Sequence, residues 1–306
     1  MKSPGALFVG LGVVAAVVLV GWFSISQSSD KSSSSSGVMS GMTMTQTVGS
    51  TDGGMTGMAM GGSGAMAGMK PLVTGADGTR SSAGGLTLEP QHAVLGTGNL
   101  TRWQLRVTDR MGMPVLRFER DQTKLMHLIV VRSDLTGYQH LHPTLGRGGV
   151  FSVEIRLPKA GTYRAIADFT TGGKRYALGV PIRVPGAAPA QPLPAEAMRS
   201  SADGFHVMVM HEPLNAGSDA QLDFTFTKDG KPVTALLPYL GAYGHLVALR
   251  KPTLAYSHVH PTSADRAQGS IGFSAEFPAS GDYRLFLQFR TFSGVHTARF
   301  TVTVSG

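Results

Sequence analysis

Six of the ten histidines in this 306-residue sequence belong to one pattern that occurs twice. The first copy consists of His127, His140 and His142, and the second consists of His245, His258 and His260. In both copies the second and third histidines follow the first by 13 and 15 residues. Neutral imidazole nitrogens bind Cu, Zn, Ni and Fe, so three histidines at a fixed spacing indicate a metal site.

The residues around the first copy predict a hairpin that brings these histidines together. An apolar, β-branched run follows His127, and the turn formers Ser133, Asp134 and Gly137 follow that run. On a strand, His140 and His142 point to the same face. If the hairpin pairs residues whose numbers sum to about 267 to 269, His127 faces one of them at a Cβ separation of roughly 5 Å. Three imidazoles then converge, and the same argument applies to the second copy.

Further residues near each copy are candidates for the same chemistry. Tyr138 and Tyr256 are either strand aromatics or donors to a histidine or a metal-bound water. His92 and His211 precede the first histidine of each copy by 35 and 34 residues. Each is either a fourth ligand or an edge-strand histidine. The remaining two, His206 and His296, are expected on the surface.

Other classes of chemistry find little support in the sequence. There is no cysteine, which excludes disulfides, thiolate metal sites and type 1 copper centres. No Glu follows either His-x-His within four residues, as a cupin requires. No carboxylate recurs between the copies to form an acid/base pair, and no nucleophile or phosphate-loop motif is present. The net charge of +8 includes no basic run. We therefore expect neither an enzyme nor a nucleic-acid-binding protein.

The N-terminus predicts export. Residues 1–23 carry one charge, Lys2, before an apolar run from Ala6 to Phe23. That length favours an uncleaved single-pass anchor in the cell membrane with the rest of the chain extracytoplasmic; the alternative is a cleaved signal peptide.

Residues 24–85 are rich in Ser, Gly, Thr and Met and are expected to form a disordered tether. Its methionines are regularly spaced in two Met-x-x-Met-x-Met units and one Met-x-x-Met unit: Met39, Met42, Met44, Met55, Met58, Met60, Met66 and Met69. Thioethers are soft ligands that select Cu(I). The alternative is compositional drift in a tether that tolerates many residues.

The rest of the chain predicts two tandem domains, residues 86–185 and 205–306, joined by a Pro/Ala linker at 186–204. These regions consist of short runs of alternating apolar and polar residues separated by Gly and Pro, and no stretch has a sustained helical period. In the first domain the expected strands are Leu100–Thr108, Val115–Arg120, Leu125–Arg132, Tyr138–His142, Val150–Leu157, Thr162–Phe169 and Tyr176–Val184. The fold class is all-β, with two immunoglobulin-like antiparallel β-sandwiches. A Pro-x-x-Gly-x-Tyr turn recurs before Tyr163 and Tyr283, and both tyrosines are expected in the core.

A family resemblance rests on the second copy. The phrase from Tyr239 to Val247, Tyr-Leu-Gly-Ala-Tyr-Gly-His-Leu-Val, followed by Tyr-Ser-His-Val-His-Pro at 256–261, resembles exported bacterial heavy-metal or copper-associated proteins, and the sandwiches resemble YtkA-like domains. The resemblance implies a protein of the cell envelope that handles copper or another metal. The partners we expect are the membrane, metal ions and another envelope copper-handling protein.

Together these patterns predict a membrane-anchored copper-binding protein that acts in resistance, sequestration or delivery. Cu(II) is expected at the histidines and Cu(I) at the methionines, with zinc as an alternative metal. The competing interpretation is a cell-envelope interaction module without metal, in which the histidines stabilise the hairpins.

Overall fold

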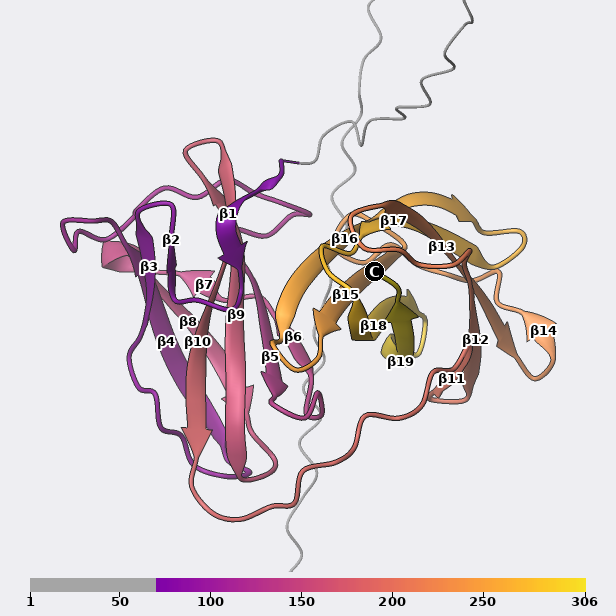
Figure 1. Ribbon diagram of the computed structural model, residues 1–306, viewed down its shortest axis with the longest axis horizontal. Helices are drawn as coiled ribbons and strands as arrows, with labels where there is room; N and C mark the ends of the chain where they lie inside the picture. The colour runs from indigo at the N-terminus through magenta and orange to yellow at the C-terminus, as the bar shows by residue number, and fades with distance from the viewer. Residues whose placement is uncertain (1–69) are drawn as a thin grey trace, which may run out of the picture. The chain divides into compact units, whose positions relative to one another are not determined.

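The computed structural model describes residues 70–306, except the side chains of His258 and His260 (Figure 1). The predicted anchor and the eight methionines of the predicted tether lie outside the described residues. The predicted end of the disordered tether at residue 85 is wrong, because Leu72–Asp77 and Ser82–Ala83 form strands that pair with strands of the first repeat. Both repeats belong to one compact unit. Among the described residues, no helix is long and apolar enough to cross a membrane.

The first repeat is built from ten strands and one turn of 3₁₀-helix. They are β1 (Leu72–Asp77), β2 (Ser82–Ala83), β3 (Leu86–Pro90), β4 (Leu100–Thr108), β5 (His127–Arg132), β6 (Gln139–Leu141), β7 (Thr144–Leu145), η1 (Arg147–Gly149), β8 (Val150–Arg156), β9 (Gly161–Thr171) and β10 (Lys174–Val184). One sheet has the order β1-β10-β9-β5-β6 and the other β2-β3-β4-β8-β7. Strands β3-β4-β8-β7 and β10-β9-β5 reproduce the ABED and GFC arrangement of immunoglobulin sandwiches, and β6 adds one strand beside β5.

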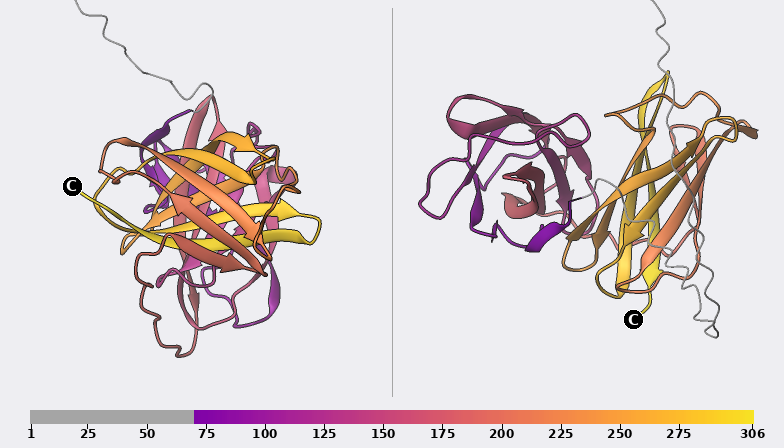
Figure 2. Two further views of the ribbon diagram at one scale, coloured as in Figure 1. Left: turned by 90° about the vertical axis from the view of Figure 1, so that its right-hand side faces the viewer. Right: turned by 90° about the horizontal axis from the view of Figure 1, so that it is seen from above.

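The second repeat carries the same frame. Its strands are β11 (Arg199–Ala202), β12 (Phe205–Met210), β13 (Asp219–Lys228), β14 (Lys231–Pro232), β15 (Gly244–Arg250), β16 (Ala255–Asp265), β17 (Ser270–Glu276), β18 (Gly281–Thr291) and β19 (Gly294–Val304). Strand β16 pairs with β15 through its first half and with β17 through its second, so it belongs to both layers. The long β18–β19 hairpin is drawn in yellow in Figure 2.

The buried apolar residues of the two repeats form three clusters. One fills each sandwich, around Trp103 and Tyr163 in the first and around Phe224 and Phe289 in the second. The third cluster joins the repeats: Ile129 and Ile166 of the first pack with Val247 and Phe286 of the second, all 0–2% exposed. Burying these side chains removes apolar surface from water at the junction of the repeats.

The predicted tyrosines close a turn as well as filling the core. The Tyr163 hydroxyl donates to the Lys159 carbonyl oxygen at 2.9 Å, and the Tyr283 hydroxyl donates to the Ala279 carbonyl oxygen at 2.8 Å. This is the tyrosine corner of immunoglobulin-like domains. Its recurrence, together with the strand order, confirms the predicted fold class.

One predicted strand of the first repeat is wrong. Residues 115–120 do not form a strand, although Glu119 makes an isolated bridge to Thr170. The segment leads into a turn where Gln122 and Thr123 have φ of 43° and 71°, which a continuing strand does not allow. The alternation of apolar residues here reflects packing of Val115 and Phe118 against the core.

Candidate metal centre

The hairpin of the first repeat has the register that the histidine spacing predicts. Strand β5 pairs with β6 so that Leu128 faces Leu141 and Ile129 faces His140, which is a residue sum of 269. All six residues of β5 are buried, because one face of the strand packs in the core of the first sandwich and the other packs in the cluster that joins the repeats. His127 is the first residue of β5, and His142 follows β6 directly. The three histidines therefore meet at one end of the hairpin.

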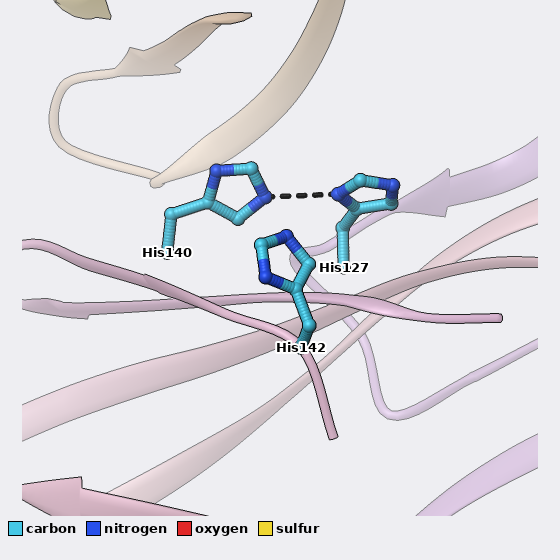
Figure 3. Close-up of side chains that lie close together, drawn as sticks. All are labelled: His127, His140 and His142. Carbon is cyan, nitrogen blue, oxygen red and sulfur yellow. Dashed lines mark hydrogen bonds between the residues drawn. The ribbon is translucent and has the colours of Figure 1, made fainter. Parts of the chain in front are cut away.

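The three imidazoles converge (Figure 3). His127 Nδ1 and His140 Nε2 lie 2.9 Å apart, and one nitrogen from each of the three rings lies within 4.8 Å of the others. The ring centroids of His142 lie 5.1 Å from those of His127 and 4.7 Å from those of His140. Among the described residues, this is the one group of three or more histidines or carboxylates with such convergence.

The outer nitrogens of two of these rings are held by oxygen atoms. His127 Nε2 lies 3.1 Å from the carbonyl oxygen of Asp121, and His140 Nδ1 lies 2.8 Å from Gln288 Oε1. The Asp121 carbonyl oxygen only accepts, so in the neutral ring His127 Nε2 carries the proton and Nδ1 holds the lone pair. His127 Nδ1 and His140 Nε2 are hydrogen-bonded when His140 Nε2 carries the proton; when Gln288 Oε1 accepts from His140 Nδ1 instead, both facing nitrogens carry lone pairs. Metal-binding histidines are commonly oriented in this way by an acceptor on the outer nitrogen.

Burial keeps the rings of His140 and His142 neutral. His127 is 1% exposed and His140 is 9% exposed. Loss of solvent, followed by the neighbouring rings of His127 and His142, holds the pKa of His140 well below its usual value. Burial, followed by His127, lowers the pKa of His142 to about 3. At neutral pH both side chains are therefore unprotonated, the state in which imidazole binds a metal.

His142 also carries a polar atom that the fold leaves unpaired. Its Nε2 is buried and has no hydrogen-bond partner. Leaving a buried polar group unpaired costs about 1–3 kcal/mol, so such an atom in a cluster of ligand-type side chains points to a missing partner.

The second copy keeps part of this frame. His245 is the second residue of the buried run of β15, and its Nε2 lies 2.6 Å from the Tyr239 carbonyl oxygen, as His127 Nε2 lies near that of Asp121. The backbone of Val247 pairs with that of His258, the counterpart of Ile129 with His140. The side chains of His258 and His260 lie outside the described residues, so their predicted role as ligands stays a prediction.

The two candidate tyrosines occupy equivalent positions but have different partners. The ring of Tyr138 stacks on Phe286 with centroids 3.9 Å apart, and its hydroxyl is buried without a hydrogen-bond partner. The hydroxyl of Tyr256 donates to Asp168 Oδ2 at 2.7 Å. Asp168 also forms a buried ion pair with Arg175 at 2.6 Å. Tyr138 is thus a packed aromatic residue, and Tyr256 orients a carboxylate.

The two candidate fourth ligands lie outside the convergent group. His92 is exposed, and its carbonyl oxygen accepts a hydrogen bond from Trp103 Nε1 at 2.9 Å. His211 is half-buried and its Nδ1 donates to the Glu212 carbonyl oxygen at 2.8 Å. Neither joins His127, His140 and His142.

His206 is exposed as expected, but the surface prediction for His296 is wrong. His296 is 5% exposed. Its Nδ1 lies 2.8 Å from Asp203 Oδ2, and its Nε2 lies 3.0 Å from the hydroxyls of Thr291 and Ser293. The order Asp, His, Ser resembles a hydrolase triad, but the side chain of Asp203 is 69% exposed to water. We interpret the network as a polar tie between two neighbouring turns.

Sequence reasoning missed the residues that orient the cluster. Gln288 lies 148 residues from the His140 ring that it contacts, and Asp168 is 88 residues from Tyr256. The Asp121 interaction uses the backbone, which no side-chain motif records. One feature of the sequence could have indicated Asp168 and Gln288: each lies five residues after the corner tyrosine of its repeat, Tyr163 or Tyr283.

Comparison with known families identifies the repeat. One family model, described as a domain of unknown function (DUF8832), matches residues 81–186 and again residues 200–306. The two matches together cover more than two thirds of the sequence. The chain belongs to the DUF8832 family. The histidine cluster therefore lies within the first DUF8832 domain, and His245 lies within the second.

Known structures add nothing to the assignment of the two DUF8832 domains. The Escherichia coli adhesin FdeC is 14% identical with a TM-score of 0.25 and covers 74% of this chain and 65% of its own. The Yersinia pseudotuberculosis adhesin InvE is 15% identical with a TM-score of 0.23, covering 72% and 58%. The chain thus spans less than two thirds of both adhesin chains. A chimeric titin Z1Z2 tandem is 18% identical with a TM-score of 0.19, covering 71% and 95%.

At such TM-scores these likenesses carry no argument about fold or function. No curated protein sequence matches the chain. Any function therefore has to be argued from the site itself.

Proposed function

We propose that this protein binds a transition-metal ion, copper above all, through His127, His140 and His142 of its first DUF8832 domain. The observation that carries the proposal is the convergence of one nitrogen from each ring within 4.8 Å. His127 Nδ1 and His140 Nε2 supply two ligand atoms, and the unpaired Nε2 of His142 supplies the third. Neutral imidazoles suit Cu(II) and Zn(II), and affinity for most such sites is higher for Cu(II).

The acceptors on the outer nitrogens support this proposal. The Asp121 carbonyl oxygen and Gln288 Oε1 hold the protons of two rings on the side away from the cluster. They fix the tautomers and increase the electron density on the inner nitrogens. With these tautomers the two inner nitrogens, 2.9 Å apart, would both offer lone pairs to a bound ion.

The proposed wider role in copper handling is argued from the N-terminal part of the sequence. The Met-rich stretch from Met39 to Met69 offers soft thioethers for Cu(I), whereas the histidines suit Cu(II). With the apolar N-terminus as a membrane anchor, the protein would hold copper outside the cytoplasm for resistance, sequestration or delivery. Deleting residues 39–69 is expected to abolish Cu(I) binding and to leave Cu(II) binding unchanged. Unchanged Cu(I) affinity would remove the methionines from the proposal.

In a competing function, the 2.9 Å contact between His127 and His140 is a structural hydrogen bond. If the Gln288 amide is turned by 180°, its NH₂ donates to His140 Nδ1, and His140 Nε2–H donates to His127 Nδ1. The histidines then stabilise the hairpin of a cell-envelope interaction module without metal. This arrangement still leaves His142 Nε2 buried without a partner, which is why we favour the metal site.

The deciding experiment is a titration of the chain with Cu(II) and with Zn(II) at pH 7. The test variant is His142→Asn, and the matched control is His92→Asn, which alters an exposed histidine of the same domain. We expect the wild type and the control to bind alike, and His142→Asn to bind about 100-fold more weakly while it remains folded. Equal binding by His142→Asn, or no binding by the wild type, would favour the interaction module.

A further inference from the structure

A fourth histidine lies beside the cluster, and it comes from the other DUF8832 domain. The ring centroid of His245 lies 6.5 Å from that of His127 and 6.2 Å from that of His140. The His245 side chain is buried, with 2% of its surface exposed. The cluster is therefore a feature of the junction between the repeats.

His245 is oriented by the same backbone device as His127. In each repeat a tight turn, bridging Asp121 to Lys124 and Tyr239 to Ala242, directs a carbonyl oxygen at Nε2 of the histidine. Because that oxygen only accepts, Nε2 of His245 carries the proton and Nδ1 is unprotonated. Nδ1 is also the nitrogen that His127 directs into the cluster. The duplication has thus produced two equivalent imidazoles, one on each side of the junction.

The distances suit a shared ion after a small approach. Two imidazoles on one four-coordinate ion, with a metal–nitrogen distance of about 2 Å, have ring centroids about 5 Å apart. The three rings of the first repeat already have separations of 4.7–5.1 Å. The ring of His245 lies roughly 1 Å farther out, which a side-chain adjustment can close.

The second repeat already supplies one element of the site. Gln288, on β18, contacts His140 Nδ1 at 2.8 Å across the junction. The same junction carries the third apolar cluster and the hydrogen bond from Tyr256 to Asp168. These contacts keep the two repeats in register, so that a ligand from each reaches one point.

We infer that the metal ion ties the two DUF8832 domains together, with His245 of the second domain completing the site formed by His127, His140 and His142. The inference rests on the proposed function and goes beyond it: the ion is a joint between domains. One ion then binds per pair of domains, and its binding free energy adds to the free energy that holds the domains together.

The first test uses the full chain and Co(II) alone as the probe. Co(II) prefers nitrogen and oxygen ligands to thioethers, and its visible absorption reports coordination number. We expect the wild type to bind one Co(II). His245→Asn should still bind one, about tenfold more weakly and with an altered spectrum, because three ligands remain. The matched control, His206→Asn, changes an exposed histidine of the second domain and should leave affinity and spectrum unchanged.

Because His245 is buried, a second measurement avoids any substitution in the site. A protease site is inserted between Ala195 and Glu196, in the exposed linker, and the folded full chain is then cut there. We expect the two halves to remain associated at least about tenfold more tightly with Co(II) than with a chelator.

The outcomes separate the two proposals. If the wild type binds Co(II) but the halves associate equally with and without it, the joint is refuted and the metal site stands. An unchanged affinity and spectrum in His245→Asn would refute it in the same way. If the wild type binds no Co(II), Cu(II) or Zn(II), both proposals are refuted.

Discussion

The two repeats share the frame of their first histidine but differ in what they present across the junction. In both, a turn carbonyl holds Nε2 of that histidine. Five residues after the corner tyrosine, however, the first repeat has Asp168 and the second has Gln288. Asp168 accepts from Tyr256, and Gln288 contacts His140. After duplication the backbone frame was kept, while the two facing surfaces became complementary to each other.

The largest expected difference in unfolding free energy is between substitutions at Asp168 and at Gln288. Asp168→Ala leaves the buried Arg175 guanidinium without its carboxylate, and we expect a loss of about 3–5 kcal/mol of unfolding free energy. Gln288→Ala removes a neutral acceptor and should cost about 1–3 kcal/mol. Denaturant unfolding of both variants measures the two values. Equal losses would show that the ion pair contributes no more than the amide.

The pH dependence of the metal-free protein should come from the histidines of the first repeat. Since burial holds the pKa of His142 near 3 and that of His140 well below its usual value, unfolding lets both take up protons. Their contribution is complete above the unfolded pKa of about 6.5 and is lost as pH falls below it, by up to about 1.4 kcal/mol per pH unit for each histidine.

Denaturant midpoints between pH 7.5 and pH 4 for the wild type and for His142→Asn measure this slope. The variant should lose stability more slowly on acidification. If the two slopes are the same, His142 is not held neutral by the fold.

Replacing the two equivalent tyrosines with Phe is expected to change the stability by smaller amounts, and to do so differently at the two positions. Tyr256→Phe removes a hydrogen bond to an ionised carboxylate and should cost about 1.5–3 kcal/mol. Tyr138→Phe removes a buried hydroxyl without a partner and should be neutral or slightly stabilising. Thermal unfolding at pH 7 compares them directly. Destabilisation by Tyr138→Phe would mean that its hydroxyl has a partner in solution.

The smallest expected effect, and the same one in both repeats, concerns the tyrosine corners. Tyr163→Phe and Tyr283→Phe each remove one hydrogen bond to a carbonyl oxygen, of 2.9 and 2.8 Å. Each should cost about 1 kcal/mol in the denaturant unfolding of the single variants. A clear difference between them would show that the two frames are less equivalent than their geometry indicates.

Periodic features of the sequence predicted most of the fold. Alternation and turn residues were sufficient for Leu100–Thr108, which is a strand with those same bounds, because local patterning determines such a strand. The strand predicted at residues 115–120 was wrong, because the apolar side chains that pack on the core there belong to a segment without regular strand structure. The histidine spacing likewise predicted the convergence of three rings, since hairpin register is local.

Contacts between distant segments were beyond such reasoning. The approach of His245 to His140 and the contact of Gln288 with the same ring depend on how two folded domains pack. His296 was misassigned for the same reason, because its partner Asp203 is 93 residues away. Single-sequence patterns report what one segment does, whereas these sites need two.

Strand β16 has a consequence for how such domains coexist at high concentration. By running from one layer of its sandwich into the other, it covers the outer edges of both β15 and β17 on that side of the second repeat. The first repeat has two very short strands there, β6 and β7, and β1 covers the outer side of β10. Unpaired edges invite strand addition from neighbouring molecules. Both repeats are thus guarded at these positions against edge-to-edge aggregation.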